Sequence, residues 1–216
     1  MNMAMVTSFI VGGILLLSIA MVNINIANSG AELTLTQITR DRLETVTAML
    51  DDDIPNMGYD LEQPTDTILT FADENRIQFY RNLCRNPERD SATMNCDEPE
   101  RITWEFFKDQ KPANARNEGH GTLIRVVEAV GIAPDTTRIE SGVTNFNIRY
   151  FNAHGRPLDQ NLSVPVNETD LRDIKQLYMQ LEVQSNEQIP GRSNNDRFIR
   201  TVWEKRFSPR NLEIEL

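Results

Sequence analysis

Two cysteines and two histidines are the side chains of this sequence best suited to metal binding or redox chemistry. Cys84 and Cys96 lie in a polar stretch, and His120 and His154 each stand beside glycine in expected turns. A structural zinc site needs about four ligands, and this scatter does not predict one. The cysteine spacing instead suits a short loop closed by a disulfide, which would form in an oxidising compartment and stabilise the fold by about 3 kcal/mol. Two unrelated thiols in a loop are the alternative.

The acidic run Asp51-Asp-Asp53 is the other candidate for chemistry. Carboxylates can bind calcium; the alternative is a solvated helix end, although acids at a helix C-terminus oppose its dipole. Asn161 and Asn167 begin glycosylation sequons, a pattern that is common by chance. Nucleophile-elbow, phosphate-loop and zinc-protease motifs are missing from the sequence. We therefore predict no enzyme, catalytic residue, cofactor, metal or small-molecule substrate.

Length and charge limit the class of protein. The 216 residues suffice for one ordinary domain and an attachment element. A net charge of −10 repels phosphate backbones, and no basic cluster with interleaved aromatics offsets it. Nucleic acid is therefore not expected as a partner.

Residues 3–22 are almost wholly apolar, and the first charged side chain is Glu32. Twenty helical residues span about 30 Å, the thickness of a bilayer core. A cleaved signal would have a basic start and a shorter apolar core, and neither is present here. We expect a retained transmembrane anchor over residues 1–30. A signal cleaved near residues 27–31 and a buried soluble helix are the alternatives.

Ala4, Ser8 and Gly12 recur every fourth residue and therefore share one face of the expected helix. Small residues on one face let another apolar helix approach closely, so we interpret them as a packing face. The alternative is the ordinary composition of membrane helices. The first basic residues, Arg40 and Arg42, lie well beyond the apolar run and do not set its orientation.

The helical pattern continues beyond the membrane, over residues 31–58. Apolar residues recur at helical spacing between charged ones; they are Leu35, Ile38, Leu43, Val46, Met49 and Leu50. Pro55 and Gly58 should end the helix.

From residue 59 to 216 the hydrophobic period becomes two, which is typical of strands. The expected strands cover residues 67–71, 76–81, 101–107, 122–127, 143–151, 177–183 and 197–205. Trp104 and Trp203 fall within them and are interpreted as core. The prediction is an α+β fold, in which a long N-terminal helix, with its first half in the membrane, packs on an antiparallel β-sheet domain.

The order of these features resembles the minor pilins and minor pseudopilins of type IV pili and type II secretion systems. The resemblance covers nearly the whole chain and is carried by the following segments: the apolar helix running into Leu50-Asp-Asp-Asp-Ile-Pro-Asn-Met-Gly-Tyr59, the paired strands from Thr67 to Arg81, Thr122-Leu-Ile-Arg125, Ile139-Glu-Ser-Gly-Val-Thr-Asn-Phe-Asn-Ile-Arg-Tyr150, the strand from Asp173 to Ser185, and Phe207-Ser-Pro-Arg-Asn-Leu212. Members of these families carry a short basic leader and, soon after it, an acidic residue. This sequence shows no basic leader before its apolar run and no acidic residue before Glu32.

The resemblance implies a structural subunit, anchored by a single pass in the cytoplasmic (inner) membrane, with most of the chain periplasmic or extracellular. Its expected partners are membrane lipid and other pilin-like subunits, bound through the N-terminal helix. The alternative function is a membrane-anchored binding module whose loops 84–100 and 108–121 capture a partner protein or surface.

Overall fold

A computed structural model describes residues 3–61, 68–82, 99–129, 133–140, 142–158, 166, 170–190 and 198–212. Its dominant element is the helix α1, Met3–Asp53, with 51 residues. The helix contains no proline, and threonine hydroxyls inside it donate to the carbonyl four residues earlier, as Thr39 does to Leu35 at 2.7 Å. It ends before Pro55, where the chain turns through Gly58 with a φ of +69°. This left-handed conformation favours glycine.

Eight strands form two antiparallel sheets in the described part of the chain. Sheet A has the order β1-β2-β3-β4-β5, with β1 at Leu69–Ala72, β2 at Arg76–Arg81, β3 at Glu100–Phe107, β4 at Thr122–Glu128 and β5 at Asp135–Ile139. Sheet B has the order β6-β7-β8, with β6 at Val143–Phe151, β7 at Gln176–Gln184 and β8 at Arg200–Phe207. Short 3₁₀ turns lie at Leu171–Asp173 and Arg210–Leu212.

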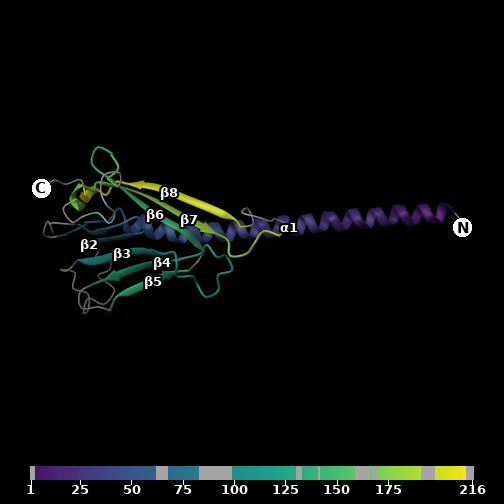
Figure 1. Ribbon diagram of the computed structural model, residues 1–216, viewed down its shortest axis with the longest axis horizontal. Coiled ribbons are helices and arrows are strands. Elements are labelled where there is room, and N and C mark those ends of the chain that lie inside the picture. Colours follow the sequence, from purple (N-terminus) through teal and green to yellow (C-terminus); the bar gives the residue numbers. More distant parts are fainter. Residues whose placement is uncertain are drawn as a thin grey trace.

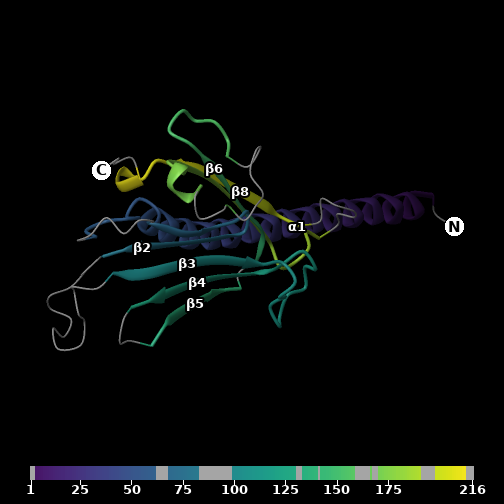
Figure 2. The ribbon, with the colours of Figure 1, turned by 60° about the vertical axis from the view of Figure 1, so that its left-hand side comes forward.

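The helix organises the molecule along one axis. Its first half projects alone, and its second half runs between the two sheets in both views (Figures 1 and 2). The strands run roughly along the helix. The two ends of the chain therefore lie at opposite ends of the molecule (Figure 1).

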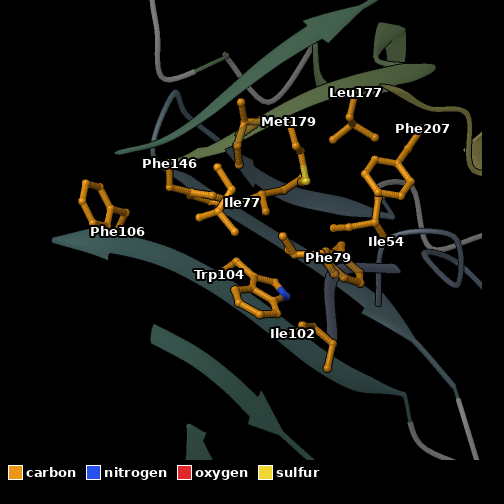
Figure 3. Close-up of a cluster of buried hydrophobic side chains, with 14 of the residues drawn as sticks. Ile54, Ile77, Phe79, Ile102, Trp104, Phe106, Phe146, Leu177, Met179 and Phe207 are labelled. Carbon is orange, nitrogen blue, oxygen red and sulfur yellow. The ribbon is translucent and has the colours of Figure 1, made fainter. Parts of the chain in front are cut away.

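The core lies where the second half of α1 meets the inner faces of both sheets. Figure 3 shows Ile77, Phe79, Ile102 and Trp104 of sheet A facing Leu177, Met179 and Phe207 of sheet B, with Ile54 of the post-helix turn among them. Trp104 and Phe79 are completely buried. Strand alternation places these residues on one face, so burial follows the period of two in the sequence.

The structure confirms the predicted α+β fold, with a long N-terminal helix against antiparallel sheet, and corrects three details. The strands form two sheets, because α1 separates them. β5 was not predicted, because four of its five residues are polar and Ile139 alone is buried. Ile38 was expected on the packed stripe of the helix but is 41% exposed.

Candidate functional site

The N-terminal half of α1 carries a continuous apolar surface on which no other described part of the chain packs. Large side chains stay 60–74% exposed along it, among them Phe9, Ile14, Leu16, Met21 and Ile26. α1 is long and apolar enough to cross a membrane. In water this surface would be strongly unfavourable, because burying each such side chain is worth about 1.5–3 kcal/mol. The exposed half of the helix is therefore one candidate functional site.

The predicted packing face lies within this exposed half. Ser8 and Gly12 are exposed, and a Cβ at Gly12 would meet nothing within 4 Å. The backbone of Ala4 is helical, whereas its side chain lies outside the described residues. The surface around Gly12 is thus open to a neighbouring helix, and its role in packing stays a prediction.

The burial of α1 begins about halfway along it. Thr39 is the first fully buried side chain, and Leu43, Val46 and Leu50 continue the buried stripe at helical spacing. The N-terminal half of the helix is thus an exposed apolar surface, and its C-terminal half packs one face into the protein core.

The far end of α1 is tied to sheet A by a buried carboxylate. Asp53, with 1% of its side chain exposed, accepts a hydrogen bond from Trp104 Nε1 at 2.8 Å. It also accepts from Arg81 Nη1 at 2.8 Å and from Arg125 Nε at 2.6 Å and Nη2 at 2.8 Å. Four donors from three strands therefore converge on one side chain. They stabilise the negative charge of Asp53, which the helix dipole disfavours at this C-terminal end.

Charge is nearly balanced around this junction. Arg81 Nε also donates to Glu100 Oε1 at 2.8 Å, and its Nη1 lies 3.9 Å from Asp52 Oδ2. The hydrogen bond to Asp53 raises the pKa of Arg125, outweighing the effect of burial, which lowers it. Both guanidiniums stay charged, so the cluster acts as a fixed structural connection.

The first carboxylate of the acidic run turns toward the other sheet. Lys205 Nζ of β8 donates to Asp51 Oδ1 at 2.8 Å. Asp51 and Asp53 are therefore engaged by cations of sheets B and A respectively. Within the described residues no group of three or more His, Cys, Asp or Glu side chains is arranged to hold a metal ion.

The two sheets are joined to each other at both ends. The buried Tyr150 hydroxyl of β6 donates to the carbonyl of Asp73 in the β1–β2 turn at 2.8 Å, and burial raises the tyrosine pKa well above its usual value. At the end nearer the exposed helix, Arg116 Nη1 donates to Glu187 Oε2 at 2.7 Å. Asn117 Nδ2 donates to Gln184 Oε1 at 2.9 Å.

His120 is buried beside these contacts, at 2% exposure, and its Nε2 has no hydrogen-bond partner in the described structure. Burial lowers its pKa, the nearby Arg42 lowers it further, and hydrogen bonds to the backbone of Gln184 and Ser185 act in the opposite direction. A neutral imidazole therefore fills this position at neutral pH.

The predicted cysteine pair, loops, sequons and core tryptophans differ in whether the structure describes them. Cys84 and Cys96, most of the loop 84–100, and the sequons at Asn161 and Asn167 lie outside the described residues. The loop 108–121 is described and lies against residues 184–187. Trp104 is in the core as predicted, and Trp203 is half-buried and packs against the core.

Sequence reasoning missed the two arginines that meet Asp53. A usable signal was present in the strand alternation. Arg81 occupies the same inward phase as Ile77 and Phe79, and Arg125 lies between Leu123 and Val127 on the inward side of β4. A charged residue at an apolar position of a strand requires a buried partner.

The chain was compared with known proteins. Its sequence matches no family model and no curated protein. Among solved structures it is similar to a type IV-like pilin from Thermus thermophilus, with a TM-score of 0.47 and 14% sequence identity over 80% of this chain and 97% of that chain.

Proposed function

We propose that this protein is a structural subunit of a pilin-like envelope assembly, such as a type IV pilus or a type II secretion-like system. It is anchored by a single pass in the cytoplasmic (inner) membrane, with residues 1–30 as anchor and residues 31–58 as the soluble continuation of the helix. Residues 59–216 form the periplasmic or extracellular domain. The observation that carries the proposal is the exposed apolar half of α1, continuous with a half built into the domain core.

Lipid and the helices of other subunits are the two surroundings that suit such a surface. A helix crosses the hydrocarbon core because its backbone hydrogen bonds are satisfied internally. The opening around Ser8 and Gly12 then lets a second helix come close. The proposed partners are therefore membrane lipid and other pilin-like subunits, bound through residues 4–22.

The anchoring half of the proposal is tested by alkaline extraction of membranes that contain the full chain. We expect the protein to stay in the membrane pellet and Leu16→Arg to move it toward the soluble fraction. A charge at the centre of a span costs about 2.5–3.5 kcal/mol. Thr34→Arg, at an exposed helical position beyond the span, is the matched control. Equal extraction of wild type and Leu16→Arg would contradict anchoring.

The assembly half is tested by photo-crosslinking from single positions in living cells. We expect adducts with other helical subunits from a probe at Phe9 or Leu16, both of which are exposed. Adducts obtained only from the loop 108–121 would favour the alternative binding module and overturn the structural-subunit proposal.

Export to an oxidising compartment also supports a disulfide between Cys84 and Cys96, which is proposed from the sequence. Mass spectrometry after thiol alkylation should show no labelled cysteine before reduction and two afterwards. Two labelled thiols in unreduced protein from native membranes would remove this part of the proposal.

A further inference from the structure

The outer face of sheet B carries three arginines at its end farthest from the exposed helix. Arg149 of β6, Tyr178 of β7 and Arg206 of β8 are directly opposite one another in the sheet register. Because neighbouring strands are about 4.8 Å apart, the two arginine Cα atoms lie about 10 Å apart on either side of the tyrosine. Arg156, in the turn after β6, extends the group, and all three arginines are exposed. We call these four residues the arginine patch.

Packing holds the patch in place. The guanidinium of Arg206 reaches across β7 to lie over the ring of Phe151, with Cζ 4.3 Å from the ring centroid. Its Nη2 also lies close to Gly155, 3.5 Å from where a Cβ would stand. Such a stacked guanidinium keeps its donor edge free for a ligand, with less side-chain freedom to lose on binding.

A carboxylate of β8 beside the patch, Glu204, is occupied by other donors. Glu204 Oε1 accepts from Gln180 Nε2 at 2.7 Å, and Glu204 also bonds the hydroxyl of Tyr178, which raises the tyrosine pKa. Within the described residues, no carboxylate forms an ion pair with Arg149, Arg156 or Arg206.

Six arginines elsewhere in the described structure do have carboxylate partners. Carboxylates pair with Arg76, Arg81, Arg101, Arg116, Arg125 and Arg200. The three arginines of the patch are thus a local positive site on a chain whose net charge is −10. An unbalanced cluster of this kind attracts a complementary anion.

We propose that the arginine patch is a docking site for an acidic segment of a partner protein. Alternate side chains of an extended peptide lie about 6.8 Å apart, so two or three carboxylates of one segment can reach neighbouring guanidiniums. Each guanidinium offers a planar pair of donors that matches a carboxylate. The inference does not depend on the anchoring or assembly of α1.

Nucleic acid fits the patch less well. The ring of Phe151 is covered by Arg206 and is not free to stack on a base. A long polyanion would also extend beyond three arginines onto an acidic protein. The favoured ligand is therefore short and carries carboxylates.

The test is fluorescence polarisation of the full chain in a neutral detergent, with a labelled peptide of alternating glutamate and glycine as the probe. We expect saturable binding that weakens as salt is raised. Arg149→Glu and Arg206→Glu should each weaken it at least about tenfold, since each removes a charged hydrogen-bond donor and adds a charge that repels the peptide. The matched control is Arg138→Glu, on an exposed position of β5 in the other sheet.

Three results would overturn the proposal. They are no binding by the wild type, an equal loss in Arg138→Glu, and tighter binding of a single-stranded oligonucleotide of the same charge. Circular dichroism and tryptophan fluorescence check that each variant is folded. The exposed arginines can change sign without disturbing the core, so an Arg149→Glu or Arg206→Glu variant that folds and keeps full peptide binding would be a fourth refuting result.

Discussion

Arg125 and Asp53 form a two-point ion pair across the interior of the protein: Nε and Nη2 of the arginine donate to Oδ2 and Oδ1 of the aspartate at 2.6 and 2.8 Å. One partner ends the long helix and the other lies in the middle of β4. The pair therefore fixes where the helix ends relative to sheet A. Since the carboxylate is almost fully buried, losing its charge leaves two guanidiniums without their main partner.

Asp53→Asn should lower the free energy of unfolding by about 3–5 kcal/mol, because it breaks a buried charge network while preserving side-chain shape. Urea titration of the full chain in detergent, followed by tryptophan fluorescence, measures this directly. Asp51→Asn removes an exposed pair with Lys205 and should cost less than about 1 kcal/mol. Similar losses in both variants would mean that Asp53 is not the main connection between helix and sheet.

His120 should make stability depend on pH near neutrality. Its folded-state pKa is lowered, so the unfolded chain binds a proton more readily, and stability should fall as pH decreases through about 6.5, the unfolded value. His120→Gln should flatten the dependence of the unfolding midpoint between about pH 7.5 and 5.5.

The matched control for this titration is His154→Gln, because His154 is exposed in a turn. It should retain the wild-type slope. If His120→Gln retains it as well, another group is responsible.

Gly142→Ala should be strongly destabilising. Gly142 has a φ of +86°, and a Cβ there would clash with the carbonyl oxygen of Gln184. Backbone strain and this contact together should cost about 2–3 kcal/mol. Gly155→Ala is the control, because its φ of +70° brings similar strain, but a Cβ there would be in ordinary van der Waals contact, 3.5 Å from Arg206 Nη2. Thermal unfolding should therefore separate the two variants; equal shifts would show that the clash has no effect.

Gly12→Leu should weaken association between copies or subunits in the membrane. Close helix approach depends on small residues, and we expect a loss of roughly 1 kcal/mol. Gly13→Leu adds the same side chain about 100° around the helix and should have less effect. Energy transfer between labelled chains in lipid vesicles measures the difference. An identical result for both would remove Gly12 from the proposed packing face.

The elements with strong local patterns were predictable from the sequence. The apolar run and the helical spacing up to Leu50 indicated α1, and alternation indicated most strands. β5 escaped because an edge strand such as Asp135–Ile139 buries little and shows little apolar alternation. The division into two sheets was also missed, since strand pairing is a non-local property that periodicity does not encode.

The Asp53 junction was harder to foresee for the same reason. The unusual acids at the helix end were visible in the sequence, but their partners are 28, 51 and 72 residues away. Only the fold brings Arg81, Trp104 and Arg125 to one carboxylate. Local pattern thus located the acid and could not identify its partners.

The position of α1 between the sheets has a mechanical consequence. At 1.5 Å per residue the helix is about 77 Å long, and its buried half ends at Asp53, at the extremity opposite Met3. A pull on the N-terminal end would therefore pass along the helix and enter the domain as shear over the whole buried stripe. Contacts loaded in shear must break together, whereas contacts that are peeled break one after another. The molecule is thus arranged to resist tension along its length.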